Sequence, residues 1–204
     1  MYRYALMLVL GFSLLAGCGK GTRSSEAQLN QPAPLFSAAT TQNDTIHLND
    51  FLGNSVVLEW ADLSCPYVTK FYQSRTMQML QKKYESLNVA WITILSTKPG
   101  TEGHMTAQQA NDYFFKMSAI PTAVILDESG ELAKLYGITT TPEIRIIDHS
   151  GTLVYQGAID SIASTDVTDI QRAENYVDSA FNQILAGQLV LLPETEPYGC
   201  PLNE

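Results

Sequence analysis

The sequence is poor in cationic residues. Its 204 residues include 12 Lys and Arg against 21 Asp and Glu, which gives a formal net charge of -9. The acidic residues are scattered along the chain, and neither a basic patch nor a nucleic-acid-binding motif is present. An acidic chain of this kind is repelled by the phosphate backbone. We therefore expect no nucleic-acid partner.

Motifs for cofactors and metals are also missing. The chain has no phosphate-binding loop, no flavin motif and no Ser-His-Asp arrangement. Its three histidines are far apart: His47 falls in a strand pattern, His104 in a Gly-rich loop and His149 in a turn. Spacing of this kind does not indicate a metal site. We expect neither a cofactor nor a metal.

A hydrophobic run long enough to cross a bilayer is absent from the N-terminus. The apolar stretch 5–15 is short and follows Arg3, which is the layout of a secretory signal. It ends in Leu-Ala-Gly-Cys, which resembles the bacterial lipobox, so residues 1–17 are predicted to be a signal peptide and Cys18 the lipidated residue. The alternative is an uncleaved signal anchor with an incidental cysteine.

The remaining chain is predicted to hold one domain. Its composition, 45% hydrophobic and 16% charged, is that of an ordinary globular protein, and no repeat is visible. We assign 18–30 to the lipidated cysteine and a flexible tether, 31–187 to the domain and 188–204 to an extended tail. The protein is expected to be exported and lipid-anchored to a bacterial membrane, facing the periplasm or the cell exterior.

Cysteine is scarce, with three in the whole chain. If Cys18 carries lipid, two thiols remain, Cys65 and Cys200, in a compartment where disulfides can form. They are 135 positions apart in the sequence. A disulfide requires Cα atoms within about 7 Å. The spacing alone leaves their pairing open.

The apolar pattern predicts an α/β fold. The run Val56–Trp60 indicates a buried strand, and 67–84 indicates a helix with a break near Ser74. The strand "VAWITILS" after that helix completes a right-handed parallel βαβ unit. A helix "AQQANDYFFKM", a strand "PTAVIL" and a short helix ending at Gly137 follow, and two strands around 148–151 form a hairpin, so the sheet is mixed.

The last helix has the strongest apolar stripe. Thr168 and Gln171 match a capping box, and Gly187 supplies a stop signal. We therefore predict one continuous helix from 168 to 187. Its stripe consists of Ile170, Ala173, Val177, Ala180, Phe181 and Ile184.

Cys65 stands where an apolar strand leads into a helix. Pro66 lacks an N–H and suits the first helical position, which makes Cys65 the N-cap. Free N–H groups and the positive end of the helix dipole stabilise a thiolate there. Val68 occupies the place of the second cysteine of a CxxC motif. The alternative is that Cys65 is an unreactive buried residue.

The stretches "GNSVVLEW", "CPYV", "YGITTTPEIRIID", "GTLVYQGAID" and "PYGC" resemble the thioredoxin-like, peroxiredoxin-related redoxins of the alkyl hydroperoxide reductase and thiol-specific antioxidant superfamily. The resemblance implies a thioredoxin-like fold, with a central mixed β-sheet flanked by helices, and thiol-based redox activity. It also implies that Thr141-Pro142 is the cis-proline loop facing the active thiol. From the residues alone, a trans proline at the start of an edge strand stays possible.

Typical peroxiredoxins carry a proline and a threonine before the peroxidatic cysteine and an arginine later in the chain. Here Leu58 and Asp62 stand at the first two positions, and Pro142 replaces the arginine. Arg145 lies within a strand and is a poor substitute. Without this polar clamp, peroxide cleavage loses its electrostatic support.

We therefore hypothesise a thiol-disulfide oxidoreductase with Cys65 as nucleophile and Cys200 as resolving thiol. Its partners would be a disulfide-bearing or thiol protein, a small thiol or a peroxide, and the membrane through the lipid anchor. His104 and Lys98 lie on the loop expected beside Cys65, and either cation would favour a thiolate. The alternatives are a thiol peroxidase and a non-catalytic thioredoxin-fold binding lipoprotein, including one that delivers copper through His104 and Cys200.

Overall fold

The structure is a computed structural model that describes residues 26–202. The predicted signal peptide 1–17, Cys18 and most of the predicted tether lie outside the described residues. Within 26–202, every helix is too short or too polar to cross a membrane.

The described chain alternates strands and helices. In the first half the elements are β1 (Ser37–Ala39), β2 (Thr45–His47), the 3-10 helix η1 (Leu48–Phe51), β3 (Val56–Trp60), α1 (Pro66–Gln73), α2 (Thr76–Glu85), β4 (Ala90–Leu95) and α3 (Ala107–Met117). In the second half they are β5 (Ala123–Leu126), α4 (Glu131–Leu135), β6 (Thr140–Thr141), β7 (Glu143–Ile147), β8 (Leu153–Gly157), the 3-10 helix η2 (Val167–Gln171), α5 (Tyr176–Leu185) and β9 (Cys200–Pro201).

Five strands form a central mixed sheet in the order β5-β4-β3-β7-β8. β3, β4 and β5 are parallel, because helical crossovers connect them, while β7 and β8 form an antiparallel hairpin. The predicted βαβ unit, the hairpin and the mixed sheet flanked by helices are confirmed.

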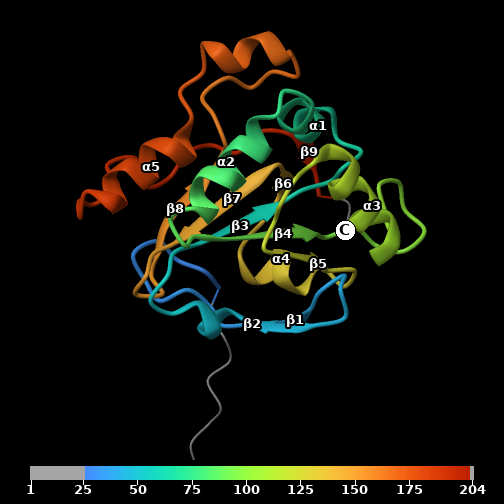
Figure 1. Ribbon diagram of the computed structural model, residues 1–204, viewed down its shortest axis with the longest axis horizontal. Coiled ribbons are helices and arrows are strands. Elements are labelled where there is room, and N and C mark those ends of the chain that lie inside the picture. Colours follow the sequence, from blue (N-terminus) through green and yellow to red (C-terminus); the bar gives the residue numbers. More distant parts are fainter. Residues whose placement is uncertain (1–25, 203–204) are drawn as a thin grey trace, which may run out of the picture.

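Helices and loops cover both faces of this sheet. Residues of α1, α2, α3 and α5 build the apolar core on one face, and residues of α4, η1 and the opening segment build the core on the other. Figure 1 shows α1 and α2 above the sheet, and α4 with the β1–β2 hairpin below it. Because β3 and β4 are buried on both sides, their sequences are nearly continuous apolar runs.

The predicted break in the first long helix is confirmed. α1 ends at Gln73, and α2 starts at Thr76. Between them Arg75 adopts a left-handed conformation with φ of 67°, and the Ser74 hydroxyl donates to the carbonyl of Phe71. A left-handed residue cannot continue a right-handed helix.

The prediction of one continuous helix over 168–187 is wrong. η2 ends at Gln171, and α5 begins at Tyr176, capped by Asn175, whose side chain accepts from the Asp178 amide. Arg172 and Ala173 form a turn and a bend, and Asn175 is extended because it pairs with the segment after β8, where Asp160 and Asn175 form an antiparallel bridge. This tertiary pairing outweighs the local helical pattern.

A charged residue sits inside the buried strand β3. Glu59 is fully buried, and its carboxylate accepts hydrogen bonds from Tyr72 Oη at 2.8 Å, Trp91 Nε1 at 2.7 Å and Thr93 Oγ1 at 2.9 Å. Burial raises the pKa of Glu59, and the three donors oppose that rise only in part. The apolar pattern of β3 did not predict this network, although a glutamate within an apolar five-residue strand is a visible signal.

The raised pKa of Glu59 predicts a pH-dependent stability. The folded state binds the proton more tightly than the unfolded state, so this contribution is complete below the usual pKa of 4.5 and is lost as the pH rises through the folded-state value. Glu59→Gln mimics the protonated side chain. We expect the free energy of unfolding of the wild type to fall relative to Glu59→Gln above pH 4.5, by up to about 1.4 kcal/mol per pH unit.

Urea unfolding of the two proteins between pH 4 and pH 8 measures this difference. Glu85→Gln, at an exposed position of α2, is the matched control and should show no such trend. A difference between wild type and Glu59→Gln that stays constant with pH would contradict the assignment.

Candidate functional site

Cys65 lies where the sequence pattern predicts it. It is the N-cap of α1, Pro66 is the first helical residue, and the Cys65 carbonyl accepts from the Val68 and Thr69 amides at 3.0 and 2.9 Å. Val68 is fully buried in the core. The position of the second CxxC cysteine therefore serves packing, and this motif supplies a single thiol.

The Thr141-Pro142 bond is cis, in agreement with the loop that the family resemblance implies. The antiparallel pairing of β3 with β7 sets Trp60 opposite Glu143, so the loop after β3 and the loop before β7 share one end of the sheet. The Thr141 carbonyl oxygen lies 3.4 Å from Cys65 Sγ. A reduced Cys65 thiol at this distance can donate to that oxygen.

The predicted tail folds back over this end of the sheet. It first follows β8: the Gln156 amide donates to the Pro193 carbonyl at 2.9 Å, and the Thr195 amide donates to the Gln156 carbonyl at 3.0 Å. It then pairs as β9 with β6, antiparallel, with Cys200 opposite Thr141. Figure 1 shows this red C-terminal segment beside β6. We call residues 193–202 the C-terminal arm.

The arm brings the two cysteines together. Cys65 and Cys200 form a disulfide, with their Cα atoms 6.0 Å apart. The pairing that the sequence left open is thus present in the structure. The site unites all four predicted residues, since Cys200 is also the strand partner of Thr141, which precedes Pro142. In this closed form Cys65 is 2% exposed, whereas Cys200 is half-buried.

A buried ion pair that the sequence pattern did not predict joins α1 to the segment after β8. Lys70 of α1 is 1% exposed, and its Nζ lies 3.4 Å from Oδ2 of Asp160, which is 3% exposed. Tyr198 of the arm donates its hydroxyl hydrogen to Asp160 Oδ1. Burial, and then this hydrogen bond, raise the pKa of Tyr198 well above its usual range, so the phenol remains a donor. Lys70 lies 90 positions from Asp160 and 128 positions from Tyr198 in the sequence, so no local sequence pattern indicates these contacts.

The two cations expected near Cys65 are His104, which pairs with Glu128, and Lys98, which is exposed. His104 Nε2 lies 2.9 Å from Glu128 Oε1, in a partly exposed pair. Lys98 is exposed and lines a cavity of about 160 Å³ that Leu202 of the arm also lines. Among residues 26–202, no three His, Cys, Asp or Glu side chains are grouped as metal ligands.

Arg145 lies on the other face of the sheet from Cys65. Side chains alternate along a strand, and Ile144 and Ile146 belong to the core that contains Cys65. The Arg145 guanidinium donates to the Tyr136 carbonyl at 2.8 Å and to Glu143 Oε1 at 2.7 Å. The guanidinium therefore forms its hydrogen bonds on the face of the sheet opposite Cys65, and Arg145 is a poor substitute for the family's arginine, as its position within the strand suggested.

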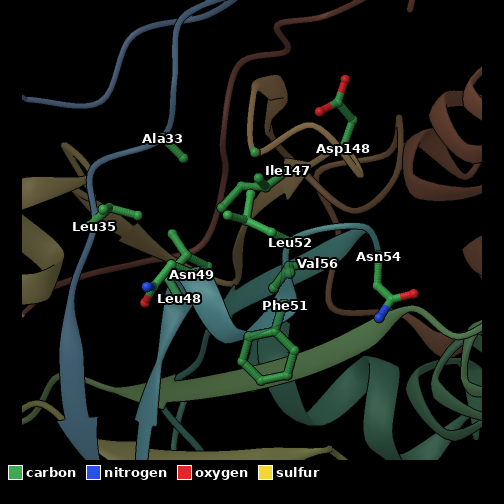
Figure 2. Close-up of a pocket in the computed structure, with 11 residues that line it drawn as sticks. Ala33, Leu35, Leu48, Asn49, Phe51, Leu52, Asn54, Val56, Ile147 and Asp148 are labelled. Atoms are coloured by element: carbon green, nitrogen blue, oxygen red, sulfur yellow. The ribbon is translucent and has the colours of Figure 1, made fainter.

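A small apolar hollow lies away from the cysteines. Figure 2 shows Ala33, Leu48, Val56 and Ile147 among the side chains around it. These four belong to the core on the face opposite Cys65. Its volume of about 20 Å³ is near that of a single water site, so it offers no room for a substrate.

Comparisons with known proteins agree with this geometry. The chain is 25% identical over 160 residues to the thiol-disulfide oxidoreductase ResA of Bacillus thuringiensis, covering 76% of this chain and 86% of the relative. A hypothetical protein from Sinorhizobium meliloti superposes with a TM-score of 0.71 at 19% identity, covering 89% of this chain and 97% of the other. The exposed lipoprotein thioredoxin of Streptococcus pneumoniae has a TM-score of 0.50 at 21% identity, with coverages of 68% and 96%.

These structural likenesses establish a thioredoxin-like fold. The AhpC/TSA family model matches residues 29–156, which is more than half of the chain and includes Cys65 and Thr141-Pro142. The chain therefore belongs to the AhpC/TSA family.

Proposed function

We propose that this protein is a thiol-disulfide oxidoreductase, with Cys65 as the nucleophile and Cys200 as the resolving thiol. The observation that carries the proposal is the disulfide between the N-cap of α1 and the C-terminal arm, beside Thr141-Pro142. The names of the relatives, thiol-disulfide oxidoreductase and exposed lipoprotein thioredoxin, point the same way.

The exchange proceeds in two displacements. The Cys65 thiolate attacks one sulfur of a substrate disulfide, which forms a mixed disulfide and releases the other substrate sulfur as a thiolate. The Cys200 thiolate then attacks Cys65 Sγ, so the Cys65–Cys200 bond forms and the second substrate thiolate leaves. Two protein thiols are oxidised and one substrate disulfide is reduced. The reverse sequence oxidises a dithiol substrate.

The free N–H groups at the start of α1 and the Thr141 carbonyl assist Cys65 in different ways. The first turn of the helix stabilises the thiolate that attacks, and the carbonyl accepts from the neutral thiol. Because the closed arm leaves Cys65 only 2% exposed, the arm has to move away after reduction before a substrate disulfide can reach Cys65.

Gly199 lets the arm approach the Thr141-Pro142 loop. Its φ is +153°, and a Cβ at this position would lie 1.9 Å from the Thr141 carbonyl oxygen. Any larger residue would push the arm away from β6. The sequence Gly-Cys is thus suited to a close antiparallel approach beside the cis-proline loop.

A peroxidase finds less support in the site. Leu58 and Asp62 occupy the positions of the family's proline and threonine, and Arg145 is committed to Glu143 on the far face of the sheet. The non-catalytic alternative makes no use of a disulfide bridging the helix start and the arm. The substrate we propose is therefore a disulfide or dithiol, carried by a protein or by a small thiol.

The place of action we propose is the cell envelope. The lipobox-like segment supports a signal peptide over 1–17, with Cys18 as the lipidated residue. We further assign 18–30 to Cys18 and the tether, 31–187 to the domain and 188–204 to the tail. An exported site fits a stable disulfide, since disulfides persist in oxidising compartments.

The cysteine roles predict distinct variant behaviour. In the full-length chain carrying Cys18→Ser, which leaves two thiols, we expect a Cys65–Cys200 disulfide that cycles with glutathione and is mapped by mass spectrometry. Cys65→Ser should lower the rate of exchange by roughly 100-fold or more, because the attacking thiolate is lost. Cys200→Ser should retain the first displacement and accumulate glutathione on Cys65. If Cys65→Ser exchanges as fast as its parent, the proposed function is wrong.

The approach of Gly199 predicts a second effect. Gly199→Ala should lower the equilibrium constant for forming the internal disulfide with glutathione by roughly tenfold or more, because the new methyl group collides with the Thr141 carbonyl. Gly187→Ala is the matched control: Gly187 also has a positive φ, but a Cβ there meets open space. Equal effects of the two substitutions would rule out the steric explanation.

The lipid anchor predicts a change of location. Cys18→Ser should move the protein out of the membrane fraction and abolish incorporation of labelled fatty acid, because the thioether-linked lipid is then missing. Wild-type protein and Cys200→Ser, which retains Cys18, serve as controls. Unchanged membrane association and labelling in Cys18→Ser would contradict lipidation at this residue.

A further inference from the structure

The buried ammonium of Lys70 depends on the C-terminal arm for one of its partners. Its Nζ lies 3.4 Å from each of three acceptors: Asp160 Oδ2, the Ile162 carbonyl and the Tyr198 hydroxyl. An ammonium group has three hydrogens to donate. One of the three acceptors belongs to the arm, and the other two belong to the body of the domain.

Asp160 depends on the arm in the same way. Its Oδ1 accepts from the Ile162 amide at 3.1 Å and from the Tyr198 hydroxyl, while Oδ2 faces Lys70. The bridge between Asp160 and Asn175 holds this residue in place independently of the arm. Lys70 and Asp160 thus form a site that the arm enters through a single side chain, Tyr198.

The ring of Tyr198 also packs within this site. It contacts Tyr67 edge to face, with centroids 5.8 Å apart, and Lys70 Nζ lies 5.5 Å from its centroid. With the arm docked, Lys70 and Asp160 are at least 97% buried. If the arm leaves, Lys70 loses an acceptor and Asp160 loses a donor. Buried charges that lose a partner are costly. These contacts therefore favour the docked arm over a released arm.

We propose that Lys70 and Asp160 form a docking site for the phenol of Tyr198, and that this docking positions Cys200 for attack on Cys65. Tyr198 is a positioning residue: it precedes Cys200 by two positions and acts through it. The inference rests on the proposed function, because it concerns the second displacement. Docking raises the local concentration of the Cys200 thiolate at Cys65 Sγ, so the internal disulfide forms and the substrate thiolate leaves.

Tyr198→Phe tests the docking, because it keeps the ring and removes the hydroxyl. The measurement is the glutathione equilibrium constant of the Cys65–Cys200 disulfide in the full-length chain carrying Cys18→Ser. We expect this constant to fall roughly tenfold, a change that corresponds to about 1.4 kcal/mol. In the reduced protein, alkylation of Cys65 should become faster, since the arm covers it for less of the time.

Two controls separate docking from a general loss of stability. Tyr113→Phe removes a phenol from α3 whose ring packs against Tyr72 and Phe114, and should leave both the equilibrium constant and the alkylation rate unchanged. In the neutral background Lys70→Met with Asp160→Asn, the further change Tyr198→Phe should have an effect of threefold or less, because the charged partners are gone. If the Tyr198 hydroxyl only stabilised the fold, Tyr198→Phe would lower the stability of the oxidised and the reduced protein equally. The glutathione equilibrium constant would then stay unchanged.

The outcomes distinguish this inference from the proposed function. A wild-type disulfide that cycles with glutathione, combined with a Tyr198→Phe constant within twofold of wild type, would overturn the docking alone. A parent protein that forms no Cys65–Cys200 disulfide would overturn the proposed function, and the docking with it.

Discussion

The pairing of the C-terminal arm with β8 and β6 is the interaction on which the site depends. The scaffold by itself places one thiol, Cys65, at the start of α1, and fills the position of the second CxxC cysteine with Val68. Backbone hydrogen bonds along Gln156 and the bridge between Thr141 and Cys200 deliver the second thiol. In the proposed exchange, a contact across 135 positions takes the place of a short dithiol motif, so the reach of the arm would be part of the chemistry.

Two buried polar clusters lie in the core on the side of the sheet that carries Cys65. Glu59 is satisfied by donors from α1 and β4, and Lys70 is satisfied by Asp160, Ile162 and the arm. They differ in one respect. All the donors of Glu59 are fixed in the domain, so that cluster holds in either redox state, whereas the Lys70 cluster is complete only when Tyr198 is docked. Departures from an apolar core of this kind are typical of functional regions.

The regular elements were predictable where local pattern and burial agree. Strand β3, helix α3 and the break at Arg75 follow from apolar runs, helical periodicity and polar interruptions that tertiary contacts reinforce. The segment 168–187 failed because two signals competed. Its apolar stripe indicated a continuous helix, but the pairing of Asn175 with Asp160 required an extended backbone in the middle.

The sequence by itself determined the class of fold, the N-cap position of Cys65 and the Thr-Pro pair ahead of β7, because each depends on neighbours within a few residues. The tertiary structure decided the bond between Cys65 and Cys200 and the enclosure of Lys70. It also turned Arg145 away from the thiol. The reason is that these features join positions distant along the chain or depend on the face to which a strand residue points, and both are settled only when the sheet, the helices and the arm pack together.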